Sequence, residues 1–435
     1  MYRTLKRAIL AAITVIGFAG SALAIDIQEV VSEGGISAWL VSDSTVPIVA
    51  VDVAFKGSGA VQDPEGEGGR ASLMAGLLSE GAGDMDAVAF QTELQNNAIR
   101  LSFEASRDHV YADMRVLSSS VERGFGLMAL ALQEPRFAAE ALERVRARKL
   151  ASLRREQTDP SALAGRLWSK AAFPDHPYGT PTAGSVESVS ALGVDAVRAA
   201  HAGAFGRDNL IIAVVGDIDA ERLAPLLDKT FGALPETADL VAVPAVTPAV
   251  GITVTETLET PQSALRFGIP ALNRDDPDFI PAFVMNHILG GGAFSSWLYK
   301  EVREKRGLAY GVYSYVAPFE HASVFGAGTS TRTDQATLAR DIILQQFEKM
   351  ATEGPSEAEL NEAKSFLTGS YALRFGSSSS IARQLLFLQI EDLGKNYVTD
   401  RNGLIEAVTL EDVRRAAARI FDGVAPTIAI VGADG

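Results

Sequence analysis

The chain repeats one helix–turn–strand pattern at a constant offset. A helical segment that begins at Val197 leads into the apolar strand pattern of residues 210–216. A second helical segment begins at Val413 and leads into the same kind of strand at residues 427–432. Corresponding residues are separated by 216 positions, and a constant offset at several landmarks is the signature of a duplicated structural unit. The sequence therefore predicts two similar domains rather than one continuous fold.

Both halves combine strand and helix signals. The strand-like runs are residues 38–41, 48–55 and 99–105 in the first half, and 264–269, 310–316 and 324–329 in the second. Long helices are expected around residues 140–155 and 357–367. This mixture predicts an α+β fold of two homologous domains, each a mostly antiparallel sheet packed with helices. The stretch 236–250, rich in Pro, Ala and Val, is the expected linker between domains 25–235 and 251–435.

The first 24 residues carry the three parts of a secretory signal. Arg3, Lys6 and Arg7 precede the apolar run 8–19, and Ala-Leu-Ala at 22–24 provides a small-x-small cleavage site. The apolar run is shorter than the roughly 20 residues of a membrane-spanning helix, so a cleaved signal peptide is favoured over an anchor. We expect the chain to be exported to the periplasm.

Composition excludes several kinds of site. A net charge of −15 disfavours a nucleic-acid surface, which needs concentrated Lys and Arg. The chain contains no cysteine, so thiolate zinc ligands and cysteine nucleophiles are ruled out. Its five histidines are at least 25 residues apart, so no helix carries two of them four positions apart. A metal site assembled from distant histidines stays open.

The segment 295–315 has the pattern of a charged helix followed by a strand. Residues 295–306 predict the helix, and Gly307 is expected to end it in a left-handed conformation. The following residues alternate, which predicts that Leu308, Tyr310 and Val312 share one face of the strand.

Arg303 therefore falls in the last turns of the helix and Tyr310 just past its end. A guanidinium and a phenol in these places can address one spot. From these residues alone, a solvated arginine and a half-buried strand tyrosine are the favoured explanation, because such pairs are common on protein surfaces.

A series of short motifs runs through nearly the whole mature chain. They are Asp63-Pro64, Ser106-Arg107-Asp108, Pro135-Arg136-Phe137, His176-Pro177-Tyr178-Gly179, and Leu289-Gly290-Gly291-Gly292 followed by Arg303 and Gly307-Leu308-Ala309-Tyr310. In their order and spacing the chain resembles the inverted-motif zinc metallopeptidases typified by pitrilysin, insulin-degrading enzyme and the mitochondrial processing peptidase. The resemblance implies a processing-peptidase-like fold in which the two domains form half of a clamshell.

In active members of that family, one helix carries H-x-x-E-H, whose histidines bind zinc while the glutamate acts as general base. The resemblance aligns Ser72 and Gly76 with the two histidines and Ala75 with the base. The third ligand falls near Ala151 or Ser152. None of these side chains binds zinc, so the resemblance implies no catalytic residue or cofactor in this chain alone, with zinc expected in a partner.

The Arg–Tyr motif of the family's second domain is retained as Arg303 and Tyr310, seven positions apart. In the family this pair binds substrate and helps to stabilise the tetrahedral intermediate. Several relatives are two-chain clamshells in which one chain carries zinc and the other the Arg–Tyr pair.

The resemblance thus implies a non-catalytic subunit of a heterodimeric zinc metallopeptidase. Its partner would be a homologous H-x-x-E-H subunit, and its substrate a peptide or unfolded protein, with no nucleic acid and no membrane span after signal cleavage. Two alternatives remain. One is a non-enzymatic scaffold or peptide-binding protein of the same family, and the other is an independent peptidase with a relocated metal site.

Overall fold

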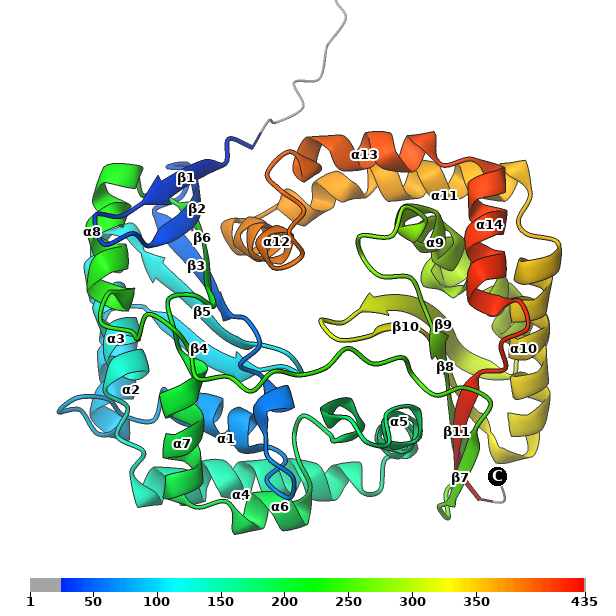
Figure 1. The fold of residues 1–435 in the computed structure, drawn as a ribbon, viewed down its shortest axis with the longest axis horizontal. Helices are drawn as coiled ribbons and strands as arrows, with labels where there is room; N and C mark the ends of the chain where they lie inside the picture. The colour runs from blue at the N-terminus through cyan, green and yellow to red at the C-terminus, as the bar shows by residue number, and fades with distance from the viewer. Residues whose placement is uncertain (1–24, 434–435) are drawn as a thin grey trace, which may run out of the picture.

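The computed structural model describes residues 25–433 and arranges them in two halves of similar design (Figure 1). The predicted signal segment 1–24 lies outside the described residues. Within the described range the first sheet has the order β1-β2-β6-β3-β5-β4 and the second the order β7-β11-β8-β10-β9. The strands are β1 (Gln28–Val31), β2 (Ser37–Ser42), β3 (Ile48–Phe55), β4 (Arg100–Ala105), β5 (Val110–Leu117), β6 (Leu210–Gly216), β7 (Thr253–Thr257), β8 (Gln262–Pro270), β9 (Ala309–Pro318), β10 (Ser323–Arg332) and β11 (Thr427–Gly432).

Both sheets are mixed but mostly antiparallel. In the first, β2 runs parallel to β6, and in the second, β7 runs parallel to β11. The remaining neighbours are antiparallel. The structure confirms the predicted α+β class with two sheets, each packed with helices.

The helices follow the same repeat as the strands. They are α1 (Arg70–Leu77), α2 (Ala87–Asn96), α3 (Val121–Gln133), α4 (Ala139–Glu156), α5 (Pro160–Ala172), α6 (Val186–Ala191), α7 (Val194–Ala204), α8 (Ala220–Phe231), α9 (Phe279–Asn286), α10 (Ala336–Thr352), α11 (Glu357–Gly369), α12 (Ser378–Ile390), α13 (Tyr397–Ala407) and α14 (Leu410–Phe421). Helix α7 precedes β6 as α14 precedes β11, which confirms the predicted helix–turn–strand unit in both halves. Among the described residues, no helix is long and apolar enough to span a bilayer.

Alternating residues of β3 divide the first half into two layers. Val49, Val51, Val53 and Phe55 point into the core formed with the helices of the same half. The residues between them face the other way, where Ala50 and Ala54 pack against Leu385 and Leu386 of α12, among others. Alternation is the rule for a strand covered on both faces, and small alanines let a helix approach the sheet closely.

One helix of each half therefore packs on the sheet of the other half. Helix α12 comes from the second half and lies on β3 and β6 of the first sheet, whereas α5 comes from the first half and lies on β8 and β11 of the second. Figure 1 shows α12 beside the first sheet and α5 beside the second. The inner face of each sheet is thus covered by a segment distant in the sequence.

Trp168 anchors α5 on the second sheet. Its indole is 5% exposed and donates a hydrogen bond from Nε1 to the carbonyl of Thr427 (3.1 Å). The ring lies directly over Gly268 of β8, where an added Cβ would be 2.1 Å from Trp168 Cζ2. A glycine is needed there because any side chain would occupy the volume of the indole.

The predicted linker 236–250 contains no helix or strand and runs between the two halves (Figure 1). Its backbone is tied to both halves. The amide of Val246 donates to the carbonyl of His321 in the second half (2.8 Å), and the amide of Ala249 donates to the carbonyl of Ala172 in the first (2.8 Å).

Candidate functional site

Arg303 lies on a π-helical turn, Tyr299–Glu304, and not in the regular helix predicted over residues 295–306. The amide of Lys305 donates to the carbonyl of Lys300 (2.9 Å), a ring one residue wider than in an α-helix. Trp297, Leu298 and Val302, in and just before this turn, are buried in the core of the second half. Gly307 follows with φ +61°, as predicted.

The prediction that Tyr310 shares a face with Leu308 and Val312 is wrong. Leu308 and Val312 are buried, but Tyr310 is 87% exposed. Opposite this stretch, Thr329 pairs with Val312 and Thr331 with Ala309, so two residues of β9 face one of β10. This β-bulge shifts the alternation by one position and turns the phenol to solvent.

The side chains of Arg303 and Tyr310 meet at the surface of the second half. The Arg303 guanidinium carbon lies 4.6 Å from the centre of the Tyr310 ring and 4.9 Å from that of Tyr299. Such cation–π contacts hold a guanidinium in place without using its N–H donors. Phe294, which is 71% exposed, packs edge-on against Tyr299 at 5.0 Å between ring centres. The arrangement therefore presents an oriented guanidinium and a solvent-facing phenol side by side.

The positions aligned with a zinc motif lie in the first half, on α1 and the adjoining α4. Ser72 of α1 accepts a hydrogen bond from the Lys149 ammonium of α4. Lys149 and Ser152 are three positions apart on α4, so they share a face of that helix. Burial lowers the pKa of Lys149, while the charges of Asp63 and Glu156 oppose this shift. A lysine cation thus joins the two helices beside the positions where the family pattern has metal ligands.

These residues do not fit zinc. Ser72, Ala75, Gly76 and Ser152 offer neither imidazole nor carboxylate, which zinc sites without cysteine require. A side chain at Gly76 would also meet Val145 Cγ1, 3.3 Å from an added Cβ. The ammonium of Lys149 would repel a dication in the same place. Leu73 and Leu77 remain fully packed in the core, so the helix is kept as a structural element.

Restoring the motif alone is expected to fail. The triple variant Ser72→His, Ala75→Glu, Gly76→His should hold no stoichiometric zinc after dialysis, because Lys149 and Val145 occupy the site and the third ligand is missing. Zinc per chain is measured by elemental analysis. The matched variant adds Lys149→Ala and Ser152→Glu and should bind more zinc than the triple variant. Tight binding of one zinc by the triple variant contradicts this account of the site.

The structure groups the predicted residues into two separate places. Arg303 and Tyr310 adjoin one another, and so do the aligned zinc positions, but the two groups lie in different halves of the chain (Figure 1). Sequence reasoning missed two participants. Tyr299 lies four residues before Arg303, a spacing that places side chains together on a helix. Lys149 lies three residues before the aligned third-ligand position Ser152, on the same face of α4.

Two family models match the chain. Residues 38–186 match insulinase (peptidase family M16), and residues 191–367 match the peptidase M16 inactive domain. A non-peptidase homolog from Helicobacter pylori is 28% identical over 351 residues, 77% of each chain. An uncharacterized zinc protease from Streptomyces coelicolor is 30% identical over 283 residues, 63% of this chain and 61% of that one.

A solved structure extends the similarity to the whole fold. The crystal structure of a peptidase M16 inactive domain from Pseudomonas fluorescens matches with a TM-score of 0.87 at 27% identity, covering 94% of this chain and 98% of that chain. The relatives thus include a protein described as a protease and one described as a non-peptidase. The fold by itself does not decide between these two functions.

Proposed function

The chain belongs to the insulinase (M16) family of peptidases, and from this premise we propose that it is the non-catalytic subunit of a two-chain zinc peptidase. In this proposal it contributes Arg303 and Tyr310 to peptide hydrolysis at a zinc site held by a homologous H-x-x-E-H partner. The observation that carries the proposal is the surface pair itself, with Arg303 in contact with the rings of Tyr299 and Tyr310 and with Tyr310 87% exposed.

The separation of the two groups supports a second chain. Arg303 and Tyr310 lie in one half and the altered zinc positions in the other (Figure 1). The altered positions offer no imidazole or carboxylate ligand, so in this proposal the metal that works with this pair is supplied by another chain. An exposed pair is suited to meeting it, whereas a pair buried within this chain would be unreachable.

An open sheet edge next to the pair supports peptide as the substrate class. Within the described residues β9 is hydrogen-bonded to β10 alone, so its other edge is unpaired. Tyr310 is the second residue of β9. An extended peptide can add to such an edge through backbone hydrogen bonds, which places its carbonyl groups beside nearby side chains.

Each side chain has a definite role in this proposal. The Arg303 guanidinium donates to a carbonyl oxygen of the bound peptide and orients it. The Tyr310 hydroxyl donates a hydrogen bond to the oxygen that becomes negatively charged as the carbonyl is attacked. The partner's zinc supplies the activated water. The secretory pattern of residues 1–24 supports the periplasm as the place where this happens.

A second candidate function is a non-enzymatic scaffold or peptide-binding protein, which the similarity to a non-peptidase homolog favours. The test is to capture the tagged chain from its native periplasm and to assay the eluate for zinc and chelator-sensitive peptide hydrolysis. We expect a stoichiometric partner that carries H-x-x-E-H. A chain recovered alone, without metal or activity, contradicts the two-chain proposal and favours the scaffold.

A further inference from the structure

A cavity of about 1500 Å³ lies between the two halves. Its wall is formed by the inner face of the first sheet beside α12, by linker residues 245–248, and by residues 270–276 and 318–323 of the second half. Arg303 and Tyr310 are not among its lining residues. Ser102, Glu104 and Arg383 line the cavity and are exposed, so solvent reaches it.

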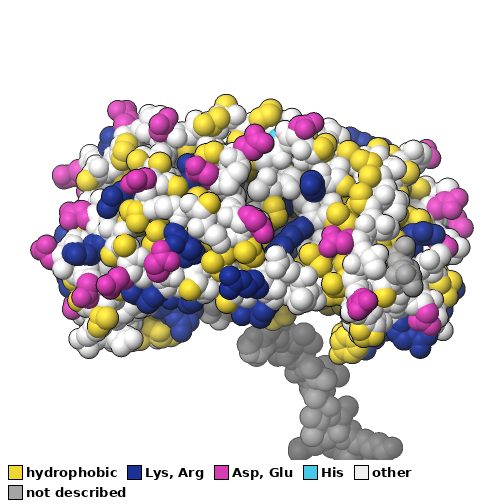
Figure 2. All heavy atoms as spheres, turned by 90° about the horizontal axis from the view of Figure 1, so that it is seen from below, with side chains coloured by type: hydrophobic (Ala, Val, Ile, Leu, Met, Phe, Trp, Pro, Cys, Tyr) yellow, Lys and Arg dark blue, Asp and Glu magenta, His cyan; other side chains and the backbone are white. Residues whose placement is uncertain are grey.

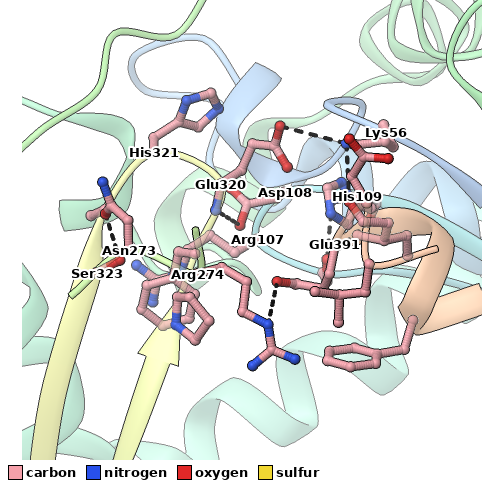
Figure 3. Close-up of a pocket in the computed structure, with 18 of the residues that line it drawn as sticks. Lys56, Arg107, Asp108, His109, Asn273, Arg274, Glu320, His321, Ser323 and Glu391 are labelled. Carbon is pink, nitrogen blue, oxygen red and sulfur yellow. Dashed lines mark hydrogen bonds and ion pairs between the residues drawn. The ribbon is translucent and has the colours of Figure 1, made fainter. Parts of the chain in front are cut away.

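The wall of the cavity carries an excess of negative charge. Nine of its lining residues are Asp or Glu and five are Lys or Arg. Some of the five cations are already paired with a carboxylate of the same wall. Three are paired with a carboxylate: Lys56 lies 3.8 Å from Glu320, Arg274 lies 3.7 Å from Glu391, and Arg419 lies 2.7 Å from Asp276. Arg107 stacks instead on the rings of Tyr178 and Phe319. Figure 3 shows Lys56 and Arg274 directed toward these carboxylates. Arg107 and Arg383 are the cations of the described wall that have no ion-pair partner.

Two aspartates stand opposite each other in this wall. Asp52 of β3 is the cross-strand partner of Asp113 of β5. Asp52 is 5% exposed, lies between Ala50 and Ala54 on the face that α12 covers, and its Oδ2 has no hydrogen-bond partner in the described structure. When both are ionised, directly opposed carboxylates are destabilising, and so is a buried carboxylate oxygen without a hydrogen-bond partner. Destabilising groups of this kind occur preferentially at functional sites, so the Asp52–Asp113 pair is a candidate binding site.

The repeat offers an internal comparison for Asp52. Asp52 pairs with Ala213 of β6, and Arg266 pairs with Ala429 of β11, so Arg266 holds the corresponding place in the second sheet. There the charged group is satisfied within the chain, because the Arg266 guanidinium bonds the Tyr313 hydroxyl. In the first sheet the hydrogen-bond partner of Asp52 is another acid, Asp113, and the Oδ2 atom of Asp52 is left without a partner in the described structure.

The pKa of Asp52 is shifted in the direction expected for a buried carboxyl group that faces a second acid and has no bound cation. Burial, and after it the facing Asp113, raise the pKa of Asp52 to about 8, against the opposing charges of Arg383 of α12 and Arg115 of β5. β4 presents the uncharged Ser102 to the same place. At neutral pH the pair therefore retains a proton, which a bound cation would displace.

We propose that Asp52 and Asp113 form a binding site for an organic cation, an ammonium or guanidinium group that enters the cavity between the two halves. Such a group can donate hydrogen bonds to both carboxylates at once. A metal ion fits less well, since no group of three or more His, Cys, Asp or Glu side chains in residues 25–433 is placed to hold one. The cation is carried either by a small free amine or by a basic side chain of a peptide.

The test uses the purified chain alone and is independent of any zinc-bearing partner. Calorimetric titrations at pH 8.5 use agmatine as the free cation and the blocked pentapeptide Ala-Ala-Arg-Ala-Ala as the peptide, with its citrulline counterpart as the neutral isostere. We expect one of the two cationic probes to bind, the citrulline peptide not to bind, and Asp52→Asn to weaken binding by at least about tenfold. Affinity should rise by up to about tenfold for each pH unit between pH 6 and 8, because binding releases a proton.

Asp392→Asn is the matched control, since Asp392 is an exposed acid that lines the same cavity. It should change affinity by less than about twofold if the aspartate pair is the site. Binding of agmatine identifies a free amine as the ligand, and binding of the arginine peptide alone identifies a basic side chain. The proposal is overturned if neither probe binds at millimolar concentration, if the citrulline peptide binds equally well, or if Asp392→Asn weakens binding as much as Asp52→Asn.

Discussion

The Tyr310→Phe variant is expected to lower the turnover number of the reconstituted two-chain peptidase by about 100-fold, the usual effect of removing one donor to a developing oxyanion. The substitution removes the hydroxyl but keeps the ring on which Arg303 stacks at 4.6 Å. Arg303→Ala should act mainly on substrate binding and raise KM. Both effects are measured with a fluorogenic peptide at saturating zinc-bearing subunit.

Tyr313→Phe is the matched control for this experiment. Tyr313 lies on the same strand and is 44% exposed, but its hydroxyl bonds Arg266 and not the surface pair. We expect it to retain activity within about twofold. Subunit association, followed by size-exclusion chromatography, should be unchanged in all three variants. Normal turnover by both Tyr310→Phe and Arg303→Ala would refute the catalytic role and leave the scaffold function.

The second large effect is expected at α5, the helix of the first half that packs on the second sheet. Trp168→Ala should lower the free energy of unfolding by about 3–5 kcal/mol, because it empties a fully packed volume. It also leaves the carbonyl of Thr427 without the indole donor at 3.1 Å. The measurement is denaturant unfolding followed by circular dichroism. Leu373→Ala, at a residue that is 80% exposed, should change stability by less than about 0.5 kcal/mol.

A double-mutant cycle with Gly268 tests the geometry of this contact. Gly268→Ala alone should be strongly destabilising, since the new Cβ would lie 2.1 Å from the indole. Combined with Trp168→Ala it should cost little more, because the volume it needs is then vacant. Additive losses in the double variant, or a loss below about 1 kcal/mol for Trp168→Ala, would show that the indole does not anchor α5.

The sequence predicts the two-part design well because the repeat involves whole elements. The offset between Val197 and Val413 makes α14 the counterpart of α7 and β11 the counterpart of β6. Both helices bury one face, so the same apolar spacing recurs in both halves of the sequence. The exchange of α5 and α12 is not predictable in the same way. Helical periodicity shows that a face is apolar, but it does not show which sheet that face covers.

The proximity of Arg303 and Tyr310 could be predicted from the sequence, but the exposure of Tyr310 could not. The spacing of Arg303 and Tyr310 brings the two residues together, as the structure confirms. The exposure of Tyr310 depends on the neighbouring strand, where the hydroxyls of Thr329 and Thr331 bond the carbonyls of Gly311 and Leu308 (2.8 and 2.6 Å) around the bulge. Pairing across strands is a long-range property, which the local alternation of β9 cannot reveal.

The exchange of α5 and α12 has a consequence for how such a chain arises. A gene for one half alone would produce a sheet whose inner face lacks its covering helix. Two copies of such a chain could each place that helix on the inner face of the other's sheet. The present chain has the form of such a domain-swapped dimer fused into a single polypeptide. Neither half then covers the inner face of its own sheet. A ribosome has to synthesise α12, near the end of the chain, before the first sheet is closed.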